Sequence, residues 1–183
     1  GSFRNKVGKV DFGSTFIAGN TDYTCGENGG TSNAVISVGA MAARSAYPNW
    51  TGKLMNDSSY VLPGFIAKFS SKGPTVDGRI KPDVTAPGFD VPSSLNNKQA
   101  EGWMMDRTLL KTVFRNDTNF WTTLNGTSMA SPHVCGIVAL MLQAYPGLSA
   151  ADVKTILHQT ATQNAATGNT PNNQYGYGIV NAY

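Results

Sequence analysis

One stretch of the sequence decides the fold: Asn125-Gly126-Thr127-Ser128-Met129-Ala130-Ser131-Pro132-His133-Val134. Polar and glycine residues here run directly into a long apolar segment, residues 134–145. Its apolar side chains occupy every face of a helical wheel, and a helix that is apolar all round is expected to be buried. Pro132 is tolerated in the first turn of such a helix, and Pro146 ends it. The sequence therefore predicts a buried helix with the hydroxyl of Ser128 at its N-terminus, where free N–H groups and the helix dipole favour developing negative charge.

An ordinary role for Ser128 is to cap the helix, because serine is a common N-cap residue. Capping does not account for the rest of the string. Residues Gly126 to Val134 resemble, at nine consecutive positions, the nucleophile signature of the subtilisin-like serine proteases, the subtilases. The resemblance implies that Ser128 is the nucleophile of a peptidase, and that Asn125 and Thr127 shape the backbone beside it.

A second short motif lies near the N-terminus. Residues 14–18 are expected to form a short buried strand that Gly19-Asn20 ends, and by itself Asn20 would be read as a turn residue. Subtilases carry Ala-Gly-Asn at the end of such a strand, and Ala18-Gly19-Asn20 matches it, although Ile17 stands where another alanine is usual. The resemblance implies that the Asn20 side chain donates to the oxyanion of the reaction, with Gly19 as support. A neutral amide donor suits that task.

Further segments extend the resemblance over nearly the whole chain. Residues 65–74 and 81–88 resemble the F-S-x-x-G-P and K-P-D-V-x-A-P-G patterns of subtilases, and residues 175–182 resemble the string that closes many subtilase domains. The apolar run at residues 33–40 has strand length and suits a parallel sheet covered on both faces. The fold class implied is α/β, with a three-layer, mostly parallel, doubly wound sheet of subtilisin-like type whose N-terminal part is missing. Residues 3–183 would then be the C-terminal part of the peptidase domain, and Gly1-Ser2 a tag remnant.

Two other regions have structural readings. Ser149 and Asp152 form a capping-box pattern that predicts a helix after residue 149. Residues 89–124 are longer than minimal family members need, and we interpret them as an insertion with a small core of its own; the alternative is a rim over the substrate cleft. Lys81 and Asp83 are interpreted as structural residues.

The catalytic base is the missing part of this site. A serine at neutral pH needs a base within hydrogen-bond reach, and that base needs an orienting acid. His133 follows Ser128 on the same helix and is expected to point away from the hydroxyl, while His158 falls in a later helix, where an ordinary surface or packing role is expected. In subtilases the Asp and His precede the oxyanion Asn, yet the residues before Asn20 contain no histidine, and Asp11 lacks the family's D-[ST]-G surroundings. We therefore expect a fragment that carries the nucleophile and oxyanion Asn without the His and Asp, inactive in isolation.

Two other functions are weighed against the peptidase. A non-catalytic subtilase-like module would bind peptides or partners, and only the sequence upstream would distinguish it. Ser128 and Asn20 favour the peptidase, because a binding module has no chemical need for either. An unrelated α/β hydrolase would require G-x-S-x-G, which the residues around Ser128 do not supply.

Composition limits the remaining classes. The chain has 183 residues, 40% hydrophobic and 14% charged, enough for one domain with a core. Its net charge of +3 is spread along the chain without a basic run, which does not indicate binding to nucleic acid or membrane. Cys25 and Cys135 permit one disulfide, and their pairing is left open. The family resemblance makes calcium possible without assigning ligands, and implies a secreted, periplasmic or cell-surface location. The expected partners are a peptide or protein substrate, and the missing N-terminal half or a second copy of the chain.

Overall fold

The structure is a computed structural model that describes residues 6–7, 10–11, 24, 30–96, 107–114 and 117–182. In chain order its strands and helices are β1 (Lys6–Val7), β2 (Val10–Asp11), β3 (Val38–Ala42), β4 (Ala46–Pro48), β5 (Leu54–Asn56), β6 (Val84–Phe89), β7 (Val91–Leu95), β8 (Thr108–Phe114), β9 (Asp117–Leu124), α2 (Thr127–Ala144) and α3 (Ala150–Thr160). The strand expected at residues 14–18 lies outside the described residues, as do Gly19, Asn20 and Cys25.

The centre of the described fold is a parallel pair of strands, β3 and β6. Val38 lies opposite Val84 and Ala42 opposite Phe89, with a register shift just before Ala42. Both strands are buried over almost their whole length, as short apolar runs covered on both faces should be. The strand expected over residues 33–40 begins only at Val38. The N–H of Ser37 donates to the Asp83 carboxylate at 2.8 Å, so that this group is taken out of the strand ladder.

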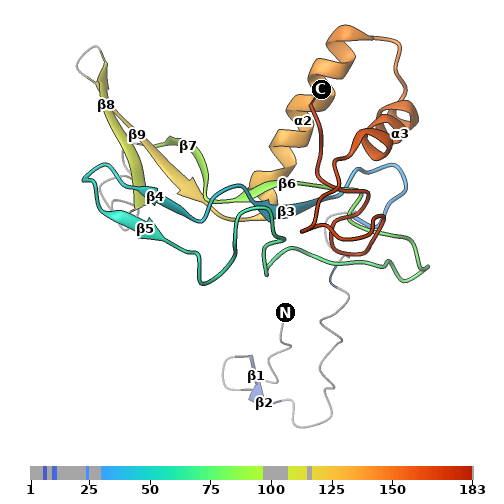
Figure 1. Ribbon diagram of the computed structural model, residues 1–183, viewed down its shortest axis with the longest axis horizontal. Helices are drawn as coiled ribbons and strands as arrows, with labels where there is room; N and C mark the ends of the chain where they lie inside the picture. The colour runs from blue at the N-terminus through green and yellow to red at the C-terminus, as the bar shows by residue number, and fades with distance from the viewer. Residues whose placement is uncertain are drawn as a thin grey trace.

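Helix α2 packs on the β3–β6 pair, as Figure 1 shows. The expectation that it is buried on every face is wrong: only Ala130 and Val134 are buried, whereas Leu140 is 62% and Leu142 39% exposed. An apolar composition shows only that a helix can be buried. The other described residues cover only the face of α2 that packs on the strand pair. The helix begins at Thr127, which places Pro132 beyond the first turn. Because proline has no N–H, the carbonyl of Ser128 lacks its usual helical partner.

Helix α3 has the predicted capping box. The Ser149 hydroxyl accepts from the Asp152 N–H, and the Asp152 carboxylate accepts from the Ser149 N–H. Buried Val153 and Leu157 attach α3 to the core. Its buried members are Ala40, Ala42, Val61, Ala67, Val84, Ala86, Phe89, Ala130, Val134, Val153 and Leu157.

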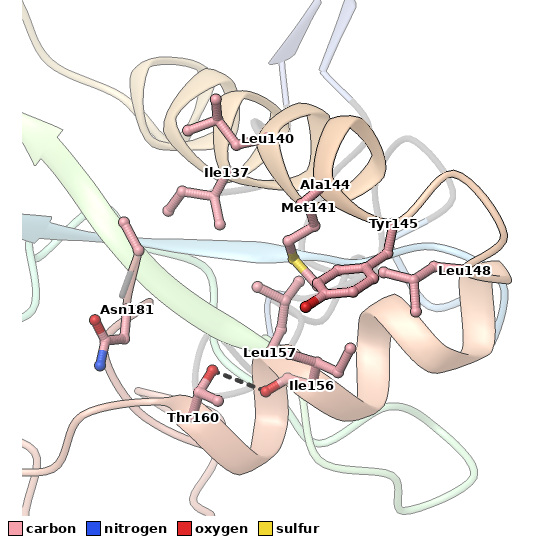
Figure 2. A pocket seen from close by; sticks show the side chains of 11 residues that line it. Ile137, Leu140, Met141, Ala144, Tyr145, Leu148, Ile156, Leu157, Thr160 and Asn181 are labelled. Carbon is pink, nitrogen blue, oxygen red and sulfur yellow. Dashed lines mark hydrogen bonds between the residues drawn. The ribbon is translucent and has the colours of Figure 1, made fainter.

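The C-terminal halves of α2 and α3 border an apolar pocket of about 270 Å³ (Figure 2). Ile137, Leu140 and Met141 of α2 line it from one side, and Ile156 and Leu157 of α3 from the other. It adjoins the exposed outer surface of α2.

Most of the inserted region forms a three-stranded antiparallel sheet in the order β7–β9–β8, which extends away from the helices in Figure 1. Phe120 of β9 is buried, and the sheet is attached to the β4–β5 hairpin by the Tyr47 hydroxyl, 2.6 Å from Thr123 Oγ1. The Trp50 N–H also donates to the Thr108 carbonyl at 2.9 Å. Residues 97–106 of the insertion lie outside the described residues, and the small core of its own stays a prediction.

The described residues combine one parallel strand pair with antiparallel sheets and two helices. This agrees with part of an α/β domain. The three-layer, doubly wound arrangement is not established by it and stays a prediction. None of the described helices is both long and apolar enough to cross a membrane.

Candidate active site

Ser128 lies in the first turn of α2 with its side chain exposed. The N-cap is Gly126, and no side chain caps this helix. Ser128 therefore does not have the ordinary capping role. Within the described part of the chain its Oγ has no hydrogen-bond partner, which leaves the hydroxyl available at the positive end of the helix dipole.

The turn before Ser128 is fixed by the end of β6. Asn125 Oδ1 accepts the N–H of Asp90 at 2.6 Å, and the N–H of Gly126 donates to the Gly88 carbonyl at 2.8 Å. Gly88 has no room for a side chain: an added Cβ would lie 2.6 Å from Ala40 Cβ and 2.8 Å from the Gly126 carbonyl oxygen. This close backbone approach connects the turn before Ser128 directly to the buried strand pair.

The other predicted support residue, Thr127, is the first residue of α2. Its carbonyl accepts the Ser131 hydroxyl at 3.1 Å, one turn further along the helix. Of the predicted site residues, the structure therefore brings Asn125, Thr127 and Ser128 together, while Gly19 and Asn20 are outside the described residues.

A cavity of about 520 Å³ opens beside Ser128, within the size range of ligand sites. One wall is the start of α2 and the other is the inserted sheet. Its lining residues are Val91 to Asn96, Thr122, Leu124, Ser128, Met129, Pro132 and His133. The insertion therefore borders the space in front of Ser128.

Neither histidine of the chain is placed to activate Ser128. His133 Nδ1 lies 2.9 Å from the Met129 carbonyl oxygen, within its own helix. His158 Nε2 lies 3.2 Å from Asp83 Oδ1, and its ring stacks on Tyr177 with a centroid separation of 3.7 Å. Burial lowers the pKa of His158, although the neighbouring Asp83 carboxylate opposes this. His133 thus bonds within its own helix, as a residue turned away from Ser128 should, and the stacked ring of His158 agrees with the surface or packing role expected from the sequence.

Asp83 is the centre of a buried ionic cluster behind the strand pair. Lys81 Nζ lies 2.6 Å from Asp83 Oδ2, and Lys154 Nζ lies 2.9 Å from Oδ1. Burial alone would raise the pKa of Asp83, but hydrogen bonds from Lys81, the Ser37 N–H and Lys154 outweigh it and lower that pKa. The cluster ties β6 to α3 and to the segment before β3.

We expect Lys81→Met to destabilise the fold by about 3–5 kcal/mol at neutral pH, because it leaves a buried carboxylate without its main partner. Urea unfolding of the variant would measure the loss. Lys154→Met is the matched control: the Lys154 side chain is 22% exposed against 2% for Lys81, so its loss should be clearly smaller. Because the pKa of Asp83 is lowered, its stabilisation is present above the ordinary value of 3.8 and is lost as the pH falls through the folded-state value. Equal losses in the two variants would contradict this account.

The structure also bears on metal and thiol chemistry. Calcium was suggested by the resemblance, but the described residues contain no group of three or more His, Cys, Asp or Glu side chains able to hold a metal. Their acidic pair Asp57 and Asp90 faces Arg107, a cation of the chain itself. No calcium ligand is therefore assigned here. Cys135 is an exposed free thiol on α2.

Sequence reasoning missed Asp90. It is an acidic residue at the edge of an insertion, and nothing in its immediate sequence distinguishes it from a solvent-exposed loop residue. In the structure Asp90 is only 1% exposed, and its N–H donates to Asn125 Oδ1.

The family model described as the subtilase family matches residues 6–178, and the chain belongs to this family. Among curated relatives, the chain is 33% identical over 171 residues to Bacillopeptidase F of Bacillus subtilis, covering 92% of this chain and 10% of that protein. It is 36% identical over 153 residues to the serine protease AprX of the same organism, covering 84% of this chain and 30% of AprX. The family and the relatives identify the protein class as subtilisin-like serine proteases.

A solved structure supports the relationship. The CspB protease of Clostridium perfringens is similar with a TM-score of 0.51 and 27% identity, covering 82% of this chain and 25% of that one. The chain thus spans between a tenth and a third of the length of these proteins.

Proposed function

We propose that this chain is the nucleophile-bearing part of a serine endopeptidase that hydrolyses peptide bonds through a Ser-His-Asp triad. The observation that carries the proposal is the exposed hydroxyl of Ser128, which lies at the start of α2 beside a cavity and does not cap the helix. A capping serine would have its oxygen engaged with the helix backbone. A nucleophile must instead present it to substrate.

The proposed reaction uses the groups that the family resemblance assigns. Ser128 Oγ attacks the scissile carbonyl carbon and its proton passes to a histidine base. The carbonyl oxygen becomes an oxyanion, which the Ser128 N–H and the Asn20 side-chain amide stabilise. The C–N bond breaks as the histidine returns the proton to the leaving amine, and water then hydrolyses the acyl-enzyme by the same steps in reverse order. Asn125 and Gly19 support the backbone at these two positions.

The histidine and aspartate of the triad come, in this proposal, from polypeptide outside this chain. His133 and His158, which are all the histidines in the sequence, are engaged elsewhere. The N-terminal part of the same domain is the source that the family's chain order indicates. The substrate is a peptide or protein, and the site of action is outside the cytoplasm: secreted, periplasmic or at the cell surface.

Covalent labelling tests this proposal. A fluorophosphonate esterifies a serine Oγ only when a base takes its proton. The native enzyme that contains this segment should be labelled at Ser128, whereas the isolated 183-residue chain should hydrolyse no peptide and resist labelling. Rapid stoichiometric labelling of the isolated chain would show that it has a base of its own. An unlabelled native enzyme that still binds peptides would favour the alternative, a non-catalytic peptide- or partner-binding module.

The isolated chain is also expected to associate. Leu140 and Tyr145 are 62% and 71% exposed beside the apolar pocket of Figure 2, and such a continuous apolar surface drives chain pairing. The contact should exceed roughly 1,000 Å² in total, the lower bound for a specific interface. It is formed with the missing half of the domain or with a second copy. The edge of β3 is partly covered within the chain, because Ala40 and Ala42 bond to residues 64–67.

Light scattering measures this association. The double variant Leu140→Lys/Tyr145→Lys should reduce the mass toward that of a monomer, because charges would have to be buried in the contact. Val76→Lys, at an exposed apolar residue in a distant loop, should leave the mass unchanged. A wild-type chain that stays monomeric at micromolar concentration and unfolds cooperatively would show that it closes its own core.

A further inference from the structure

Asp90 has an unusual environment between β6 and β7. Its φ is 52°, a left-handed conformation that Asp tolerates better than most residues. The residue is 1% exposed, and neither carboxylate oxygen has a hydrogen-bond partner within the described ranges. A buried carboxylate with so few partners is costly, so a compensating charge must hold it in place.

That charge is Arg107, at the entry to β8. Arg107 Nη1 lies 3.8 Å from Asp90 Oδ1, and its Nη2 lies 3.1 Å from Asp57 Oδ2. Asp57 follows β5, so one guanidinium joins the segment after β5 to the residue that follows β6. The same region holds Tyr47 of β4, whose hydroxyl lies 3.5 Å from the Arg107 carbonyl oxygen.

The surroundings of Asp90 shift the pKa of its carboxyl group in opposite directions. Burial raises its pKa to about 6, and the negative charge of Asp57 adds to this, while Arg107 and Arg44 oppose it. Tyr47 is the remaining titratable neighbour, and burial raises the pKa of its hydroxyl. Asp90 therefore changes its charge near pH 6.

Asp90 is coupled to the nucleophile through its backbone. Its N–H donates to Asn125 Oδ1 at 2.6 Å, and Gly88, two residues earlier, accepts the N–H of Gly126 at 2.8 Å. These two bonds hold the turn that leads into Ser128. A shift of residue 90 must move Asn125, and with it the backbone that sets the direction of the nucleophile.

We propose that Asp90, held by Arg107, which Asp57 binds in turn, is a positioning residue that fixes the Asn125–Gly126 turn and thereby couples Arg107 of the insertion and the segment after β5 to Ser128. The inference rests on the proposed peptidase function. It assigns Asp90 no contact with substrate. Asp90 acts through Asn125. The direction of the Ser128 hydroxyl therefore depends on the ion pair of Asp90 and Arg107, which lies outside the catalytic residues.

Kinetics of the native enzyme that contains this segment provide the first test. Arg107→Gln should lower kcat by about tenfold to a hundredfold with KM changed less than about twofold, because a small misplacement of a reacting group costs rate rather than ground-state binding. Arg107→Lys keeps the charge and should recover most of the rate. The control Arg79→Gln removes the exposed pair with Asp77 and should leave kcat unchanged. Equal kcat in wild type, Arg107→Gln and Arg107→Lys would overturn the proposal.

Nuclear magnetic resonance gives a test that does not depend on peptidase activity. In the native protein that contains this segment, the resonances of the Asn125 side-chain amide and the Gly126 N–H should shift with a midpoint near pH 6, because the pKa of Asp90 is raised to about 6. Asp90→Asn should abolish that titration while Asp77→Asn leaves it in place. If the native enzyme cleaves no peptide, the proposed function fails and these resonances still decide the coupling. Asn125 and Gly126 resonances that do not shift with pH in the wild-type protein would overturn the proposed coupling.

Discussion

Replacing Ser128 by Ala should abolish peptide hydrolysis by the native enzyme that contains this segment. The substitution removes the oxygen atom that forms the acyl-enzyme. Among the described residues, Ser128 is the only hydroxyl residue of α2 that lines the cavity. The expected loss in kcat is about six decades, the size known for the nucleophile of subtilisin, a member of this family, rather than a value derived from this chain. Steady-state hydrolysis of a chromogenic peptide would measure it.

The matched control is Ser131→Ala. Ser131 lies one turn further along the same helix, is exposed, and donates its hydroxyl to the Thr127 carbonyl at 3.1 Å. Its loss should change kcat by less than about threefold, because a single surface hydrogen bond contributes only about 1 kcal/mol. Residual activity of Ser128→Ala within tenfold of the wild type would show that another residue is the nucleophile.

Replacing Asn20 by Ala should lower kcat by about two to three decades and leave KM nearly unchanged. This size is the one recorded for the oxyanion Asn of subtilisin itself, and it reflects a donor that bonds the oxyanion only in the transition state. Asn20→Asp should be no better than Ala, because a carboxylate cannot donate and would repel the developing negative charge.

The control for this second substitution is Asn119→Ala, at an exposed position of β9. It should leave both kinetic constants unchanged. If Asn20→Ala retains full kcat, the oxyanion donor is another group, and the match of residues 18–20 to the family pattern has misled the assignment. An equal rise in KM and no fall in kcat would instead make Asn20 a substrate-binding residue.

The sequence by itself determined the features that depend on local chemistry. It placed the start of α2 at the serine, its end before Pro146, and the capping box of Ser149, because caps and breakers act within one turn of the chain. It also identified the family, since a catalytic string tolerates little variation, and the family model now confirms it. The structural roles of Lys81 and Asp83 follow the same pattern-based reasoning and agree with their burial.

Only the tertiary structure decided which surfaces are covered. The apolar composition of residues 134–145 predicted full burial, yet the described neighbours cover one face of α2. The start of β3 moved to Val38 because a distant carboxylate, Asp83, takes the N–H of Ser37. The same reason hides Asp90 from sequence reading: its contact with Arg107, 17 residues along the chain, and the contact of Arg107 with Asp57 arise from segments that meet only in the folded structure. Burial and charge balance are sums over neighbours far apart along the chain, so local sequence cannot specify them.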